Sequence, residues 1–354
     1  MKDKLDIAFL GGDSAGGIIN DMFQDGLSNH PRVNKVNFEC VFERFGKMPF
    51  EPTPAEEIID NITKYDIIFV KSDEIGDERE ALFDKLGLWD RVVINDCKDD
   101  QHVEEKYTPK CLLCLKRSWD TEFLPKDLSR TVPLAYSIMD SYYNCIPLSF
   151  YPAHNHKTYS PQGRDMQVTC TLPQCYRGVP RDILAHAVKN YAWGRTSPEH
   201  GSHNIQLTLV YTGGWLYSSM GTWYRHPIQM PYPEVNWWYI YMHFLRRSQV
   251  IFTAASHSAV CDVRQWESMS SGALVFIDFF DVPMPHPFEE GKHFIKIDMK
   301  DLPGTFKKAQ DLLSNNEERQ AIAQAGFEHG RLYHSTRARM DYVFDEIDKR
   351  KKWD

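Results

Sequence analysis

Four polar side chains stand at helical spacing in the stretch from Asp262 to Phe280. Arg264, Glu267, Ser268 and Ser271 are three or four residues apart, so a helix over this stretch would place them on one face. A carboxylate on such a face can accept hydrogen bonds from a ribose diol, and an Arg side chain can bind a diphosphate. Such a face can therefore bind a phosphorylated nucleoside, and the alternative is that Arg264 and Glu267 pair with each other on the helix.

A glycine and an apolar run follow these side chains directly. Gly272 is expected to end the helix, because glycine readily adopts positive φ. The apolar run Ala273–Phe279 predicts a strand that is buried on both faces of a parallel sheet. Open α/β sheets bind ligands beyond the carboxyl ends of their strands. We therefore expect the Arg, the Glu and the two hydroxyls to lie together near that edge.

This stretch resembles the donor-binding segment of GT-B glycosyltransferases, in particular glycosyltransferase family 1-like and CgeB-like members. The matching residues are Arg264, Trp266-Glu267, Ser271-Gly272 and the strand Ala273–Asp278. Downstream, Phe288-Glu289-Glu290-Gly291-Lys292 resembles the family's loop of a Phe, two residues and a Gly, and Ala321–Arg339 is similar to the closing helices of the domain. The resemblance covers about residues 165–345.

One position departs from the family pattern. Retaining members often carry a second Glu eight positions before the ribose-binding one, and here that position is Ala259. The sequence therefore leaves open whether the stereochemistry is retained or inverted.

The resemblance implies an α/β fold with two Rossmann-like domains, each with a parallel sheet. It implies an acceptor domain over residues 1–150, a nucleotide-sugar donor domain over 151–335, and a C-terminal helix over 336–354 that crosses back to the first domain. The candidate donor-binding residues are Arg264, Glu267, Ser271, Gly272, His257, Gly213, Gly214 and Arg181. For each Arg, a structural salt bridge is the alternative, and for His257 it is an ordinary loop position.

The length and the order of elements agree with two domains. A chain of 354 residues is long for one core. Apolar runs that read as strands alternate with helical stretches, which predicts mostly parallel sheets. The expected strands are Leu5–Leu10, Val36–Phe42, Asp66–Lys71, Val92–Cys97, Cys111–Lys116, Met166–Leu172, Asn204–Tyr211, Val250–Ala254, Ala273–Phe279 and His293–Asp298. A proline-rich segment, 144–165, is expected to link the domains.

A glycine loop follows the first expected strand. It contains Gly11, Gly12, Asp13, Ser14 and Gly16. It is neither a dinucleotide fingerprint nor a P-loop, since its glycines are misplaced for the first and no Lys follows Gly16. We expect it to let an acceptor or a phosphate approach the backbone, and Asp13 is the candidate catalytic base. The alternatives are a loop that needs glycine only to turn and an Asp13 that caps the next helix.

Charge and cysteine content limit the partners and the compartment. The net charge of −8 argues against an electrostatic hold on nucleic acid. No Asp-x-Asp motif occurs, so we expect no metal and no cofactor. Eight scattered cysteines indicate reduced thiols and a cytoplasmic compartment, and no apolar run is long enough to span a membrane. Cys111 and Cys114 are expected to lie in one strand with their thiols on opposite faces.

These observations lead to one principal hypothesis. We expect a metal-independent glycosyltransferase, hexosyl or pentosyl, that moves a sugar from a nucleotide-sugar donor to a carbohydrate or other hydroxyl acceptor. Two alternatives remain: a non-catalytic protein that binds a sugar nucleotide, and a GT-B-fold sugar-nucleotide epimerase.

Overall fold

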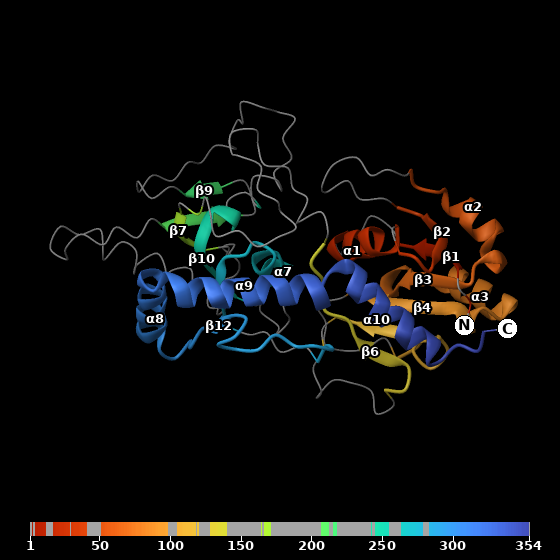
Figure 1. Cartoon of the computed structure of the whole chain (residues 1–354). Helices are drawn as coiled ribbons and strands as arrows, with labels where there is room; N and C mark the ends of the chain where they lie inside the picture. The colour runs from red at the N-terminus through yellow and green to blue at the C-terminus, as the bar shows by residue number, and fades with distance from the viewer. Residues whose placement is uncertain are drawn as a thin grey trace. The chain divides into compact units, whose positions relative to one another are not determined.

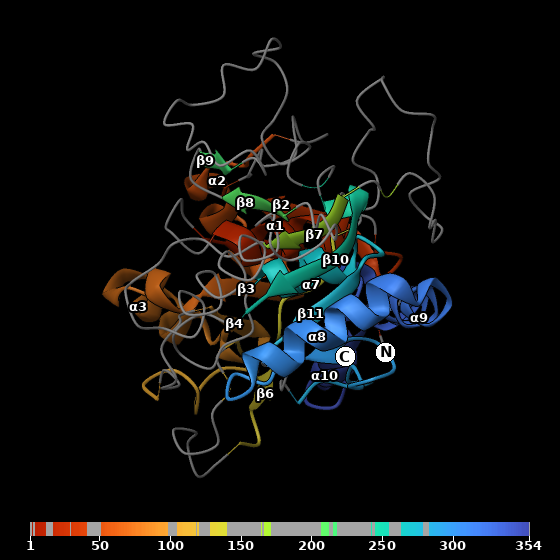
Figure 2. The ribbon, with the colours of Figure 1, turned by 90° about the vertical axis from the view of Figure 1, so that its left-hand side faces the viewer.

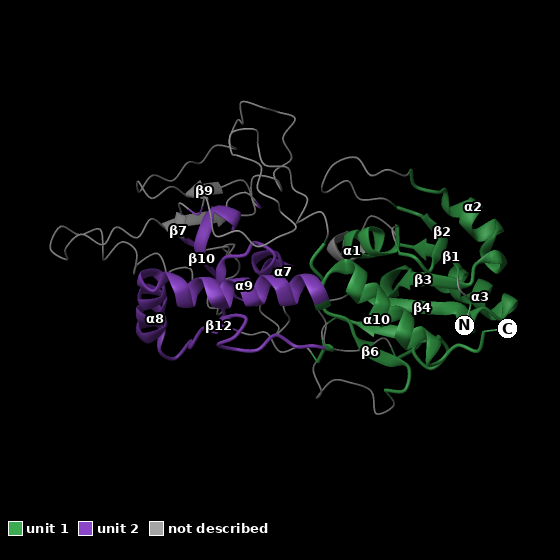
Figure 3. Ribbon diagram, in the orientation of Figure 1, with its two compact units in different colours: residues 1–139, 282–285, 333–354 green, residues 140–281, 286–332 purple. Residues whose placement is uncertain are grey.

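The computed structural model of the protein describes residues 2, 4–11, 17–28, 30–40, 51–97, 105–117, 119, 128–139, 164, 166–170, 207–211, 215–217, 242, 245–254, 263–278 and 283–353. The chain divides into two compact units (Figure 3). Unit 1 comprises residues 1–139, 282–285 and 333–354, and unit 2 comprises residues 140–281 and 286–332.

Unit 1 is built on a parallel sheet with the strand order β2-β1-β3-β4-β5-β6 (Figure 1). Its strands are β1 (Leu5–Leu10), β2 (Val33–Phe38), β3 (Ile67–Lys71), β4 (Val92–Asp96), β5 (Leu113–Lys116) and β6 (Thr131–Pro133). The chain moves outward from β1 to β2 and then returns to place β3 on the other side of β1. This reversal creates a topological switch point, where doubly wound sheets bind ligands.

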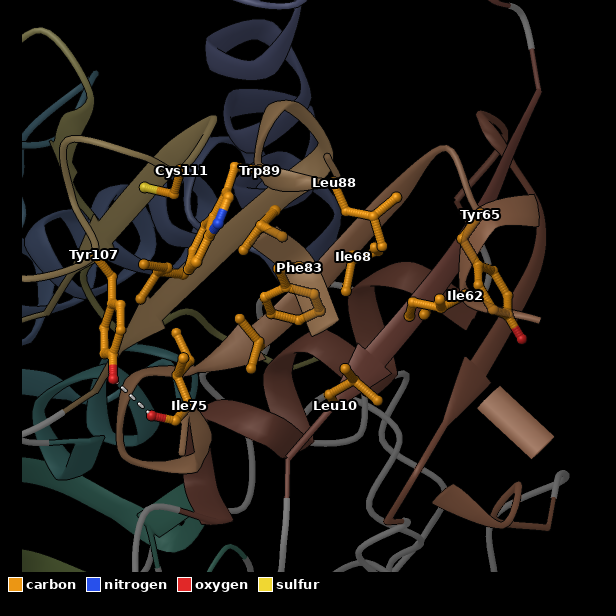
Figure 4. Packing of buried hydrophobic residues seen from close by; sticks show 14 of the residues in the cluster. Leu10, Ile62, Tyr65, Ile68, Ile75, Phe83, Leu88, Trp89, Tyr107 and Cys111 are labelled. Atoms are coloured by element: carbon orange, nitrogen blue, oxygen red, sulfur yellow. Dashed lines mark hydrogen bonds between the residues drawn. The ribbon is translucent and has the colours of Figure 1, made fainter. Parts of the chain in front are cut away.

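Helices flank this sheet. They are α1 (Gly17–Ser28), α2 (Ala55–Asp60), α3 (Asp77–Leu86) and α10 (Thr336–Asp348), with single 3₁₀ turns at Ile62–Lys64, Ser72–Glu74 and Trp89–Arg91. On one face of the sheet, the rings of Phe9 and Phe69 contact Phe23 of α1, with centroid distances of 5.4 and 5.2 Å. On the opposite face, a second core gathers α3 and the residues near Trp89 (Figure 4).

The last helix belongs to unit 1. In α10 the apolar stripe of Met340, Val343, Phe344 and Ile347 is buried, and the helix packs against α1. The red α1 and the blue α10 lie side by side although they come from opposite ends of the chain (Figure 1). The approach is close at Gly26, where a Cβ atom would stand 2.6 Å from Met340 Cγ. The prediction that the final helix returns to the first Rossmann-like unit is confirmed.

Unit 2 contains a second sheet, with the order β12-β11-β10-β7-β8-β9. Its strands are β7 (Met166–Cys170), β8 (Leu207–Tyr211), β9 (Trp215–Tyr217), β10 (Ser248–Thr253), β11 (Leu274–Ile277) and β12 (Ile295–Lys296). All pairings are parallel except that of β8 with β9. The two parallel sheets confirm the predicted fold class.

Three helices accompany this sheet within the described residues of unit 2. They are α7 (Val263–Met269), α8 (Leu302–Ser314) and α9 (Asn316–Tyr333). One face of β10 and β11 buries Phe252 and Phe276, whose rings stack at 4.8 Å, against Phe306 of α8 and Ile322 of α9. Figure 2 shows α8 lying across this part of the sheet.

The prediction for the two closely spaced cysteines is wrong. Cys111 and Cys114 both lie in the core between the sheet and α3, not on opposite faces. The strand β5 begins only at Leu113, so Cys111 lies in the preceding turn and strand alternation does not apply to it. Both thiols are free, and burial raises the pKa of Cys111 to about 12. They are unreactive packing residues.

Candidate functional site

The helix α7 carries the two charged residues of the candidate donor site. Arg264 is its second residue and is half-buried, while Glu267 lies mid-helix with a relative exposure of 0%. The other five residues of α7 are also buried, because the helix packs against both β10 and β11. The sequence therefore places a carboxylate inside unit 2, where an ion is tolerated only with compensating partners.

Ser271 and Gly272, which we expected to lie beside Arg264 and Glu267, lie instead at the amino edge of the sheet. Arg164 Nη1 donates to the carbonyl of Ser248, the first residue of β10, at 2.8 Å, and its Nη2 donates to the carbonyl of Ser271 at 2.9 Å. Ser271 and Gly272 are therefore at the amino edge. The expectation that they share the carboxyl edge with Arg264 is wrong, because α7 runs back against the strand direction before β11 begins.

The Ser271 hydroxyl makes two hydrogen bonds within this turn. It donates to the carbonyl of Ser268 at 2.6 Å and accepts from the amide of Ala273 at 3.1 Å. Gly272 has a φ of 74°, a left-handed conformation that favours glycine. These two residues close α7 and start β11, as the predicted helix stop requires. Their assignment to donor binding stays a prediction.

A loop that follows β11 packs directly against α7. The ring of Phe288 lies 5.9 Å from the ring of Trp266 in α7 and 5.1 Å from that of His329 in α9. His293 stacks on His329 at 4.2 Å. The loop turns at Gly291, where φ is 77°. The three segments that carry the family resemblance are thus in mutual contact within unit 2.

His293 holds this loop in shape. Its Nδ1 accepts a hydrogen bond from the backbone amide of Glu289 at 2.9 Å. Burial, with smaller contributions from the nearby His329 and Lys292, lowers the pKa of His293 to about 4. The ring is therefore neutral at neutral pH, as its role as acceptor requires. Sequence spacing alone did not identify His293, because its partners come from different elements.

The helix α9 approaches the same cluster at a glycine. A Cβ atom on Gly326 would lie 2.3 Å from the carbonyl oxygen of His293 and 2.9 Å from Met269 Cε. No side chain fits there without displacing backbone. Gly326 is thus a positioning residue for α7 and the loop, and a lone glycine inside a helical pattern was its only sequence signal.

In unit 1, the start of the glycine loop meets an acidic side chain. The amide of Gly11 donates to Glu39 Oε2 at 3.0 Å, and Glu39 Oε1 accepts from Arg79 Nη2 at 2.7 Å. A phosphate at this amide would have to displace the Glu39 carboxylate. The structure therefore favours a hydroxyl or cationic neighbour at Gly11 over a phosphate.

Several predicted site residues lie outside the described residues. These are Asp13, Gly12, Ser14, Gly16, Gly213, Gly214, His257 and Arg181. The assignment of Asp13 as base, of the other loop residues to the acceptor and of the rest to the donor stays a prediction.

Sequence reasoning missed a polar cluster at the carboxyl edge of the unit 1 sheet. Here Lys116 Nζ contacts Asp96 Oδ2 at 3.1 Å, and these side chains are 0% and 1% exposed. Lys71, Asn95 and Arg117 are also buried, at or next to the carboxyl ends of β3, β4 and β5. The available signal was a charged or amide residue closing each of three apolar runs.

Two further features bear on the chemistry. Within the described part of the chain, no group of three or more His, Cys, Asp or Glu side chains could hold a metal ion. Over the same residues, no helix combines the length and the apolar character that crossing a bilayer requires.

Comparison with known proteins agrees with this architecture. Residues 210–345 match the family model described as glycosyl transferase-like, and this segment includes α7, the Phe288 loop and α9. No curated protein matches the chain significantly.

Solved structures match nearly the whole chain at low identity. A glycosyltransferase from Rickettsia africae ESF-5 has a TM-score of 0.56 and 9% identity, over 99% of this chain and 100% of that one. An alpha-glucosyltransferase in complex with UDP and a 13-mer DNA has 0.55 and 11%, over 98% and 100%. Anabaena Alr3699/HepE in complex with UDP has 0.50 and 9%, over 98% and 100%. The chain therefore has the GT-B fold of two Rossmann-like units.

Proposed function

We propose that the protein is a glycosyltransferase that moves a sugar, hexosyl or pentosyl, from a UDP-sugar to a hydroxyl acceptor without a metal ion. The observation that carries this proposal is the placement of Glu267. It is a fully buried carboxylate on α7, inside the segment that matches the glycosyl transferase-like model, on a GT-B fold. The UDP moiety is proposed because the similar Anabaena and alpha-glucosyltransferase structures are described as UDP complexes.

The proposed roles follow from the chemistry of the donor. Transfer breaks the bond between the sugar and a diphosphate, so negative charge develops on the leaving oxygen. Arg264, at the start of α7, supplies a guanidinium for the diphosphate, while Glu267 accepts hydrogen bonds from the ribose diol. If the reaction inverts, a base must take the acceptor proton, and Asp13 stays our candidate for it.

The Phe288 loop supports the donor site indirectly. The ring of Phe288 packs on that of Trp266, the neighbour of Glu267. The loop therefore holds α7 in a fixed orientation. A rigid α7 keeps the carboxylate and the guanidinium at a constant separation.

The direct test is donor binding and donor breakdown with pure protein. We expect UDP and UDP-glucose to raise the melting temperature, with ADP as the nucleotide control. We also expect slow release of UDP from UDP-glucose that EDTA does not prevent. Loss of turnover in EDTA that Mn²⁺ or Mg²⁺ restores would contradict metal independence. Binding without any UDP release, with or without acceptors, would identify a non-catalytic binder, and a changed sugar still attached to UDP would identify an epimerase.

A further inference from the structure

Three buried polar side chains share one face of the unit 1 sheet at its carboxyl edge. Lys71 of β3 stands in register with Asn95 of β4, and Asn95 with Leu115 of β5. The backbone amide of Arg117 donates to the carbonyl of Asp96 at 3.1 Å, so the ladder with β4 continues one residue beyond β5 and Arg117 lies on the same face as Leu115 and Asn95. Phe69, two residues before Lys71, contacts α1, so this is the face that α1 covers.

The opposite face of the same edge is internally satisfied. There Asp96 and Lys116 are in register, their ion pair is 3.1 Å long, and Ser72 Oγ lies 3.4 Å from Asp96 Oδ1. A buried pair with partners on both sides is a structural element.

Asn95 carries a side-chain amide that the described part of the fold leaves unsatisfied. It is 1% exposed, yet neither its side-chain nitrogen nor its oxygen has a hydrogen-bond partner. Leaving a buried polar group without a partner is unfavourable, and such groups in native proteins call for an explanation. An amide that lacks both a donor and an acceptor partner is suited to neighbouring sugar hydroxyls.

Positive charge flanks this amide. Lys71 Nζ pairs with Asp73 at 3.0 Å, but the Asp73 side chain is 39% exposed, so water competes for that carboxylate. The Arg117 guanidinium lies over the ring of Tyr136 at 5.1 Å and donates to the hydroxyl of the same side chain. Both cations lie close enough to Cys97 to lower the pKa of its thiol, although burial raises that pKa more.

We propose that Asn95, Lys71 and Arg117 bind a phosphorylated sugar, with the amide on its hydroxyls and the two cations on its phosphate. The reading of this sugar phosphate as the acceptor rests on the glycosyltransferase function proposed above, whereas the binding site itself does not. The phosphate supplies the anion that two side-chain cations on one face would hold by charge-assisted hydrogen bonds.

Asn95→Leu is the decisive variant. Replacing an unsatisfied amide by an apolar side chain of similar volume is neutral or stabilising. We expect the melting temperature of the free protein to stay the same or rise, while affinity for a sugar phosphate falls at least tenfold. Asn37→Leu is the matched control: Asn37 is buried in β2, and its amide donates to Thr53 Oγ1 at 3.0 Å. This control should lose stability and keep affinity.

The measurement is calorimetric titration of the full chain with glucose 1-phosphate, glucose 6-phosphate, glucose and UDP. We expect at least one sugar phosphate to bind and glucose to bind much more weakly, and Asn95→Leu should leave UDP affinity unchanged. Failure of both sugar phosphates to bind, wild-type affinity in Asn95→Leu, or a melting temperature lowered as in Asn37→Leu would overturn the site. If UDP binds and the sugar phosphates do not, the proposed function stands and this second site is refuted. If a sugar phosphate binds and UDP does not, the second site stands and the proposed function is refuted.

Discussion

The ring of Trp266 lies 5.9 Å from the ring of Phe288, and this contact joins α7 to the loop that follows β11. The two residues belong to two separate stretches that carry the family resemblance. Through this contact the loop braces the helix that carries Arg264 and Glu267. Each of the predictions below tests one part of this arrangement.

Phe288→Ala should destabilise the protein by about 3–5 kcal/mol, the range for truncating a buried Phe. Phe288 is 7% exposed and contacts Trp266, His293 and His329. Denaturant unfolding measures the loss. Leu332→Ala is the control, because Leu332 is 64% exposed and its truncation should change stability by less than about 0.5 kcal/mol. Equal effects of the two changes would show that the loop does not brace α7.

Gly326→Ala should also destabilise the protein. Helix propensity alone favours Ala over Gly by about 1 kcal/mol, but we expect the close contact at this position to outweigh it. The new methyl would meet the His293 carbonyl oxygen at 2.3 Å, and backbone cannot yield as a side-chain tip can. We expect a net loss of about 1–3 kcal/mol, the usual cost of overpacking.

Gly76→Ala provides the control for this prediction. Gly76 precedes α3, and a Cβ atom there would meet nothing within 4 Å. Its melting temperature should stay near that of the wild type. A Gly326→Ala protein that melts at or above the wild-type temperature would refute the close contact of α9 with the loop.

The stability of unit 2 should depend on pH through His293. Its pKa in the folded protein is about 4, below the ordinary value of 6.5. Between these values the unfolded chain binds a proton that the folded chain does not, so stability falls as pH drops from 6.5 towards 4. Above pH 6.5 this contribution is fully present. The loss attributable to His293 should be roughly 2–3 kcal/mol.

His293→Gln isolates this effect from other titrating groups. Unfolding free energies of the wild type and the variant at several pH values from 7 to 4 give two curves. The difference between them should shrink as the pH falls, because the variant has no group to protonate at this position. Parallel curves would show that His293 titrates alike in the folded and unfolded chains.

The sequence predicted elements best where local signals and packing agree. Predicted and observed bounds coincide for β1, Leu5–Leu10, a short apolar run whose residues are buried except for the partly exposed Asp6. The strand β2 begins at Val33, three residues before the predicted start. It lies at the edge of the sheet, so its polar Asn34 and Lys35 face solvent and hid the strand from an apolar-run criterion.

The site was harder to predict, for reasons of geometry. Helical spacing correctly placed Arg264 and Glu267 on α7, but it cannot tell which edge of a sheet a helix end reaches, and Ser271 lies at the amino edge. Asn95 had no local motif, because its significance depends on missing partners in three dimensions. The cluster of Phe288, His293 and Gly326 is likewise a product of tertiary contacts.

Arg264 offers a partial test of the donor assignment. Arg264→Ala should weaken binding of UDP more than binding of uridine, because only the phosphates interact with the removed charge. Arg337→Ala, on the exposed side of α10, is the control and should affect neither. Equal weakening of nucleoside and diphosphate by Arg264→Ala would show that the guanidinium acts on the fold and not on the ligand.

Titration of UDP into Glu267→Gln tests the central claim most directly. The change keeps the shape of a side chain that is 0% exposed and removes its charge, and Glu346→Gln, at 8% exposure on α10, is the matched control. We predict that Glu267→Gln binds UDP about 1.5–3 kcal/mol more weakly than wild type, the range for charge-assisted hydrogen bonds, while Glu346→Gln binds it normally. Unchanged UDP affinity in Glu267→Gln, together with a lowered melting temperature, would contradict the assignment of α7 as the donor site.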